Sequence, residues 1–186
     1  LKEKATVGMY TVSNQEIIGI PDIIRDTKVI FNVKINDVEI PFERTVVYKY
    51  NDGVKGEMYN FVDIVPEVTT SILERVLLFR DTKSKMIPVK VRAGKDNIKG
   101  NLQLESPKSW NVSPKEIPFA LDKKGTEQIF YFEVTPPVNP EEVSAKSVAV
   151  VDNKRFDKDQ TIIEFSHITK QMVLKSAESK FIRMDL

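Results

Sequence analysis

The sequence predicts an all-β protein built as two tandem immunoglobulin-like antiparallel β-sandwiches. Short runs rich in Val, Ile, Thr, Phe and Tyr recur along the chain, separated by Gly, Pro, Asn and Asp about every ten residues. Helical periodicity is scarce. The strand pattern restarts after Pro66 and supplies about nine strands, enough for one complete sandwich. We therefore expect a small sandwich in residues 1–67 and a larger one in residues 68–186.

The first clear strands lie in residues 28–45. Val29, Phe31, Val33 and Ile35 alternate with Ile30, Asn32 and Lys34, which lets one face of a strand turn inward. The Asn36–Asp37 pair is typical of a tight turn leading into a second strand. These residues predict a β-hairpin.

A second hairpin is predicted in "RTVVYKYNDGVKGEMYN", residues 44–60. The "NDG" stretch at 51–53 is expected to supply the positive-φ turn, and the return strand is expected to stop at Pro66. Arg44, Asp52 and Glu57 are more polar than a hairpin requires. We expect these charges to cross-link the hairpin or to line a seam with a neighbouring domain.

The larger sandwich is predicted from strand-like stretches beyond Pro66. One local exception is "NPEEV" at 139–143, which fits either a single helical turn or a loop. The stretches are "EVTTSILERVLLFRD", "MIPVKVRAG", "IKGNLQLES", "WNVSP", "EIPFALD", "EQIFYFEVTPP", "SAKSVAVVDN", "TIIEFSHI" and "SKFIRMDL".

Composition narrows the function classes. Lys plus Arg (28) nearly balances Asp plus Glu (27), so a net charge of +1 gives no field to attract nucleic acid or an anionic membrane. No apolar run approaches the roughly 20 residues needed to cross a bilayer. The absence of cysteine excludes disulfides, thiolate metal sites and a cysteine nucleophile. The opening "LKEKATVGMYTV" suggests a fragment of a longer protein.

Catalytic candidates are few. His167 is the one histidine, and a strand continuing through it would leave its ring half-buried beside Phe165. Neither a zinc site nor a serine triad can be assembled from it, and no phosphate-binding glycine motif occurs. An independent enzyme would have to work through carboxylates alone. The acids of residues 152–159 lack EF-hand spacing and predict a hairpin turn at Asn153 and Lys154.

Three aromatic residues are the candidate ligand or interface positions. Trp110, flanked by turn residues, fits either packing over the rim of the core or an exposed platform for a sugar ring. Tyr48 and Tyr59 of the second predicted hairpin are the other two, on an exposed face.

Three stretches resemble the region that follows the catalytic domain in large bacterial PIG-L/LmbE-like deacetylases. The first is an R-x-V-x-Y-[KR]-x-x-D-x-V-x-G-E run leading into I-V-P, with Gly53 where the family usually has proline. The second resembles an NPCBM-associated Ig-like module, and the third is similar to a Y-x-H-I-P-x-Q tail, with Phe165 for tyrosine and Thr169 for proline. The matching positions are Arg44, Val46, Tyr48, Lys49, Asp52, Val54, Gly56, Glu57, Ile64, Val65 and Pro66 in the first, and Pro107, Trp110, Val112, Ser113, Pro114, Phe130, Phe132, Val134, Pro136 and Pro137 in the second.

The resemblance implies a non-catalytic accessory region of a zinc-dependent N-deacetylase acting on N-acetylated sugars. The family's zinc and base belong to an H-P-D-D motif that these 186 residues do not contain, so no catalytic residue, metal ligand or cofactor is expected in this segment. The expected partners are an N-terminal catalytic domain and, as a second candidate, a glycan. A carbohydrate-binding module and an adhesion or assembly domain remain alternatives. A periplasmic or secreted location is what such Ig-like modules suggest.

Overall fold

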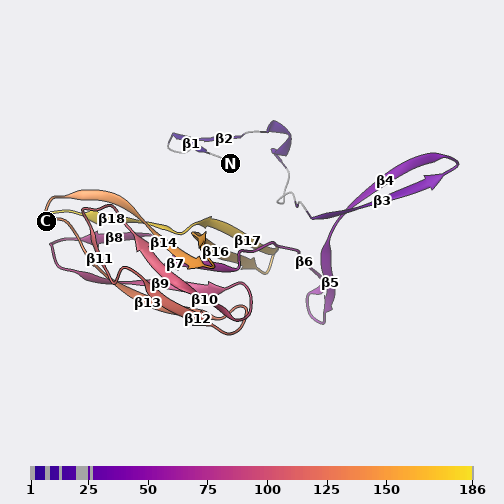
Figure 1. Ribbon diagram of the computed structural model, residues 1–186. Helices are drawn as coiled ribbons and strands as arrows, with labels where there is room; N and C mark the ends of the chain where they lie inside the picture. The colour runs from indigo at the N-terminus through magenta and orange to yellow at the C-terminus, as the bar shows by residue number, and fades with distance from the viewer. Residues whose placement is uncertain (1–2, 7–8, 13, 20–24, 26, 186) are drawn as a thin grey trace. The chain divides into compact units, whose positions relative to one another are not determined.

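The computed structural model describes residues 3–6, 9–12, 14–19, 25 and 27–185. It divides the chain into two compact units, Leu1–Val62 and Asp63–Leu186. The sequence placed this division five residues later, between residues 67 and 68. Figure 1 labels the strands of both units. In the part of the chain that the structure describes, no helix is long and apolar enough to cross a membrane.

In its described residues, the first unit contains three two-stranded antiparallel sheets and one short 3₁₀ helix, Gln15–Ile17. Among the described residues, no strand pairs with a strand of another of these sheets, so each sheet is a separate hairpin. The strands are β1 (Glu3–Thr6) with β2 (Met9–Thr11), β3 (Lys28–Ile35) with β4 (Val38–Thr45), and β5 (Val47–Asp52) with β6 (Gly56–Phe61).

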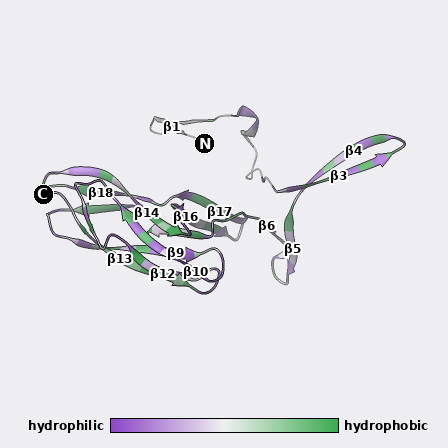
Figure 2. Ribbon diagram, in the orientation of Figure 1, coloured by the Kyte–Doolittle hydropathy of each residue, from purple (hydrophilic) through white to green (hydrophobic). Residues whose placement is uncertain are grey.

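The β3–β4 hairpin has the expected turn, with Asn36 and Asp37 at φ 47° and 66°. In its register Phe31 lies opposite Phe42 and Val33 opposite Ile40, so apolar residues gather on one face. Figure 2 shows this alternation. Phe31 nevertheless remains 54% exposed. Alternation correctly predicted two faces, but only a second layer would bury the apolar one.

The second unit is a largely antiparallel sandwich of two sheets, to which the two-stranded β16–β17 hairpin is added. Sheet I has the order β11-β13-β9-β7, and sheet II has the order β12-β10-β14-β18-β8, with β15 also paired to β14. The strands are β7 (Val68–Ile72), β8 (Val76–Phe79), β9 (Lys85–Ala93), β10 (Ile98–Glu105), β11 (Asn111–Ser113), β12 (Ile117–Leu121), β13 (Glu127–Thr135), β14 (Glu141–Val151), β15 (Lys154–Phe156), β16 (Lys158–Phe165), β17 (Ile168–Ser176) and β18 (Glu178–Arg183).

The strand order of these sheets is that of an immunoglobulin-type sandwich. With β7 as strand A, sheet I reads D-E-B-A, and sheet II contains C, F and G as β10, β14 and β18. The first edge strand is divided between the two sheets. β7 pairs with β9 in sheet I, and the next strand, β8, pairs in parallel with β18 in sheet II. All-β architecture and an Ig-like sandwich are therefore confirmed. The segment expected to be a helical turn or a loop instead leads directly into β14, which begins at Glu141.

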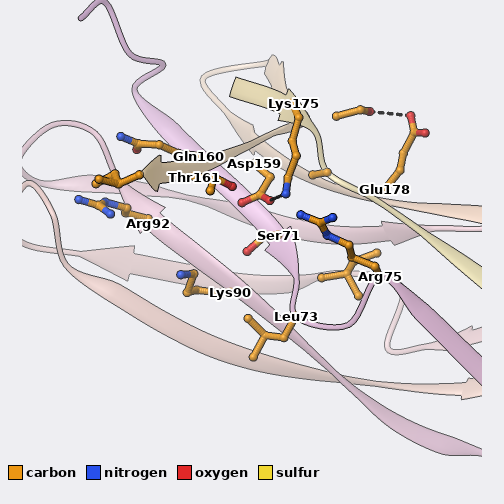
Figure 3. Close-up of a pocket in the computed structure, with 14 residues that line it drawn as sticks. Ser71, Leu73, Arg75, Lys90, Arg92, Asp159, Gln160, Thr161, Lys175 and Glu178 are labelled. Carbon is orange, nitrogen blue, oxygen red and sulfur yellow. Dashed lines mark hydrogen bonds and ion pairs between the residues drawn. The ribbon is translucent and has the colours of Figure 1, made fainter. Parts of the chain in front are cut away.

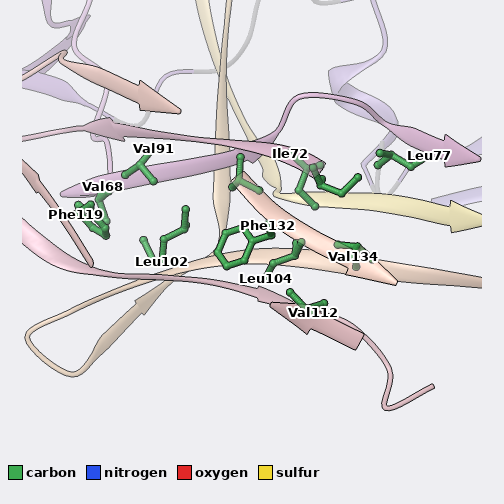
Figure 4. Packing of buried hydrophobic residues seen from close by; sticks show 14 of the residues in the cluster. Val68, Ile72, Leu77, Val91, Leu102, Leu104, Val112, Phe119, Phe132 and Val134 are labelled. Atoms are coloured by element: carbon green, nitrogen blue, oxygen red, sulfur yellow. The ribbon is translucent and has the colours of Figure 1, made fainter. Parts of the chain in front are cut away.

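The core lies between the two sheets and follows the period-two pattern of each strand. Along β9 the side chains of Ile87, Val89 and Val91 are buried, whereas Lys90 and Arg92 between them are only partly covered. Phe132 of β13, facing the same space, is fully buried. Figure 4 shows how these apolar side chains interdigitate. The interior of the sandwich is thus filled mainly by apolar side chains, so we look for binding sites on its surface and edges.

The β16–β17 hairpin is inserted into the last strand of sheet II. β15 pairs with β14, the chain leaves at Asp157, and it rejoins the edge at Ala177, whose N–H donates to the carbonyl oxygen of Asp157 (2.9 Å). β18 then continues beside β14. The preceding turn has positive φ at Asp152 and Asn153, one residue earlier than predicted. The insertion places β16 against β7 of sheet I.

Candidate functional site

Trp110 is part of the core. Only 3% of the residue is exposed, and its ring lies edge-on to Phe79 (centroids 5.0 Å apart) and tilted against Phe181 (5.4 Å). Its Nε1–H donates to Glu141 Oε2 at 3.2 Å. Of the two roles the sequence left open, packing is the one that this geometry fits, because no face of the indole is open to a sugar ring.

Tyr48 and Tyr59 are exposed but do not form one site. Tyr59 pairs with Lys49, the neighbour of Tyr48, so the two tyrosine rings project from opposite faces of the β5–β6 hairpin. Tyr48 instead stacks near Tyr50, with centroids 5.7 Å apart. Tyr59 lies beside the ammonium of Lys49, 5.7 Å from its ring centroid. A ligand gripped by Tyr48 and Tyr59 together is therefore not compatible with this register.

The charged residues of the same hairpin act locally. Asp52 Oδ1 accepts hydrogen bonds from the N–H groups of Val54 and Lys55, both at 2.9 Å, and these bonds hold the pKa of Asp52 below its usual value. Gly56 supplies the positive φ (79°), which the sequence had placed at residues 51–53. Arg44 lies on β4, exposed, and donates to the carbonyl oxygen of Glu43. Of these three charges, Glu57 cross-links the hairpin as expected, because its Oε2 lies 2.5 Å from Lys49 Nζ on the facing strand.

His167 also differs from expectation. β16 ends at Phe165, and His167 is exposed in the turn to β17, with its ring 5.9 Å from that of Phe165. The half-buried ring was expected for a strand that continues through His167, and the strand does not do so. In the described part of the chain, no group of three or more His, Cys, Asp or Glu side chains is placed to hold a metal ion.

A cleft of about 660 Å³ lies between the outer side of sheet I and the β16–β17 hairpin (Figure 3). We call it the hairpin cleft. One wall comes from β7, the loop after it and the outward-facing side chains of β9, and the other from β16 and β17. Thr69 and Ser71 point away from the core of sheet I yet are only 5% and 8% exposed. β7 is therefore covered on its outer side as well.

Cationic side chains dominate the charge of the hairpin cleft. They are Arg75 from the loop after β7, Lys90 and Arg92 from β9, and Lys175 from β17. Lys90 Nζ and Arg92 Nη1 share one carboxylate, that of Glu127, at 3.2 and 3.3 Å. Lys175 Nζ lies 3.2 Å from Asp159 Oδ2 across the hairpin.

The base of the hairpin is held by one lysine. Lys146 Nζ of β14 lies 3.3 Å from Asp157 Oδ2 and 3.1 Å from Glu178 Oε1, the residues at which the hairpin leaves and rejoins the sandwich. Glu178 also accepts a hydrogen bond from the Ser176 hydroxyl at 2.5 Å. We call this group the Lys146 clamp. It joins both ends of the hairpin to β14.

The pKa values of the clamp reflect this pairing. Hydrogen bonds from Ser176 and then Lys146 lower the pKa of Glu178. Burial alone would raise the pKa of Asp157, but the hydrogen bond from Lys146 and the charge of Lys158 outweigh it and leave that pKa below its ordinary value. The hydrogen bonds to Glu178 and Asp157 raise the pKa of Lys146. All three groups are therefore charged at neutral pH.

The sequence indicates one wall of the hairpin cleft but not the other. Lys90 and Arg92 alternate with buried valines in "VKVRA", which marks a cationic outer face on that strand. Lys175 lies some eighty residues later in the chain, and its approach to this face depends on where the inserted hairpin folds back. That long-range placement has no local sequence signal.

Comparisons with known proteins give little further guidance. No family model matches the chain, and no curated protein matches it. Among solved structures, it is similar to the structure of WR4, a C. elegans MSP family member, with 9% sequence identity and a TM-score of 0.32. The match covers 63% of this chain and 98% of that one. Similarity at this level supports no inference about function.

Proposed function

We propose that these 186 residues are a non-catalytic accessory region of a zinc-dependent N-deacetylase that resembles the PIG-L/LmbE-like family and acts on N-acetylated sugars. In this proposal the β-sandwich supports or positions an N-terminal catalytic domain or its substrate. The zinc and the catalytic base belong to the H-P-D-D motif of that domain, and this segment contributes no cofactor ligand.

The observation that carries the proposal is the structural role of the shared R-x-V-x-Y-K-x-x-D-x-V-x-G-E run. Asp52 closes the turn through two backbone N–H groups, Gly56 adopts the positive φ that follows it, and Glu57 Oε2 lies 2.5 Å from Lys49 Nζ across the strands. Each of these positions is explained by forming the β5–β6 hairpin. This structural role supports the proposal that the run forms part of an accessory module rather than a reaction centre.

The architecture of the second unit is compatible with this role. Its interior is filled by apolar side chains, and Trp110 and Phe132 are part of that core. Sandwiches of this kind carry function on loops and edges. The inserted hairpin and its cleft are such an edge feature.

The proposal is tested by reading the coding sequence upstream of Leu1. We expect an alternating α/β region with an H-P-D-D motif within a few hundred residues, because domains of this size are typical. A signal peptide directly before Leu1, or an unrelated domain in place of the α/β region, would remove the deacetylase assignment and favour a binding or adhesion module.

A further inference from the structure

The hairpin cleft has the size of a ligand site and is built on a rigid wall. Its volume of about 660 Å³ lies within the range of roughly 300–1,000 Å³ common for small-molecule pockets. The β9 wall belongs to a central strand of sheet I, and the opposite wall is anchored by the Lys146 clamp. One wall is thus part of the packed sheet, and the other is joined to the sandwich at the base of the hairpin.

Positive charge in the cleft is only partly neutralised. Lys90 and Arg92 have one carboxylate between them, and Lys175 has one of its own. The guanidinium of Arg75 makes no hydrogen bond or ion pair with the described residues. The four cations face three carboxylates, those of Glu127, Asp159 and Glu178, which leaves an excess of one positive charge in the cleft.

Arginine beside hydroxyl and amide groups favours a particular ligand chemistry. A guanidinium binds a carboxylate through two parallel hydrogen bonds, and Arg75 points into the cleft with all of its donors available (Figure 3). Gln160 and Thr161 line the same space and offer partners for sugar hydroxyls. None of the described residues that line the cleft is aromatic. A neutral sugar would therefore lack the stacking contact on which its binding commonly depends.

We propose that the hairpin cleft binds a carboxylate-bearing glycan, such as a uronic acid oligomer, with Arg75 holding the carboxylate. The choice of a glycan rests on the proposed function, from which the sugar chemistry comes. The preference for an acidic glycan over a neutral one rests on the charge of the cleft itself.

Calorimetric titration of the 186-residue chain with tetragalacturonate at low salt tests this inference. We expect saturable binding of tetragalacturonate and none of the neutral N-acetylglucosamine tetramer. Arg75→Gln is expected to weaken binding about tenfold or more, the usual loss for a hydrogen bond between charged groups. Arg80→Gln is the matched control, because Arg80 is also exposed and lies outside the cleft. Near-UV circular dichroism checks that both variants remain folded.

Three results would overturn the inference. They are no saturable heat with tetragalacturonate, equal weakening by Arg75→Gln and Arg80→Gln, and a tetraglutamate peptide that binds as tightly as the glycan with the same dependence on Arg75. The last would make the cleft a site for acidic protein segments. Failure here leaves the upstream H-P-D-D motif untouched, whereas Arg75-dependent glycan binding without that motif would retain the cleft and reject the deacetylase.

Discussion

Replacing Trp110 with alanine is expected to lower the free energy of unfolding of residues 63–186 by about 3–5 kcal/mol. The side chain is 97% covered and contacts the rings of Phe79 and Phe181. Each aromatic pair contributes about 0.5–1.5 kcal/mol beyond the burial of apolar area. The indole N–H also donates to Glu141, but that carboxylate is partly exposed and regains water, so its hydrogen bond adds about 1 kcal/mol.

Urea denaturation followed by far-UV circular dichroism measures this loss. In thermal denaturation of the same variant, the expected fall in melting temperature is about 10–20 °C for a unit of this size. Tyr131→Ala is the control, since Tyr131 is 54% exposed on the outer side of sheet I, and it should change stability by no more than about 0.5–1 kcal/mol. If Trp110→Ala were no more destabilising than Tyr131→Ala, the indole would be a surface group and the account of it as core would be wrong.

Two further predictions concern β10 and the hairpin. Gly100→Ala should lower the free energy of unfolding by about 1–3 kcal/mol or more, because a Cβ there would lie 2.3 Å from a backbone carbonyl oxygen of β14. Lys99→Ala, at the exposed neighbouring position, is the control in thermal unfolding. A destabilisation of equal size in the two variants would refute the steric argument. Lys146→Met should speed hydrogen exchange in β16 and β17, because it releases Asp157 and Glu178. The difference between this variant and the wild type should be fully present above the ordinary carboxyl pKa values of about 4 and should vanish as pH falls through the lowered pKa values of both acids. At high pH it should persist beyond about 10.4, the ordinary lysine pKa, because the pKa of Lys146 is raised. A difference in exchange that did not change between pH 7 and pH 2 would contradict the ion-pair explanation.

The alternation of apolar and polar residues within single strands predicts much of this fold. The period-two burial of Val89 and Val91, with Lys90 and Arg92 outward, could be read directly from five residues of sequence. The Asn36–Asp37 turn was equally legible. In both cases the physical cause, a pleated backbone or a positive φ, acts between near neighbours.

Features set by distant parts of the chain were not predictable in the same way. Alternation in residues 28–45 does not reveal whether a second layer covers the apolar face, and in the described residues the hairpin stands as its own sheet. Asp157 and Glu178 are ordinary surface acids until the fold brings both to Lys146. The hairpin cleft likewise lies between strands that are far apart in the chain. No local sequence motif therefore marks the residues of the cleft.

The central claim is that this region serves an N-deacetylase without catalysing the reaction itself. Acetate release from N-acetylated sugar oligomers in the presence of zinc tests it most directly, comparing the product of the complete coding sequence with residues 1–186 alone. The account predicts release by the complete protein and none by the 186-residue chain. Acetate release by the 186-residue chain, or an inactive complete protein with no H-P-D-D domain, would contradict it.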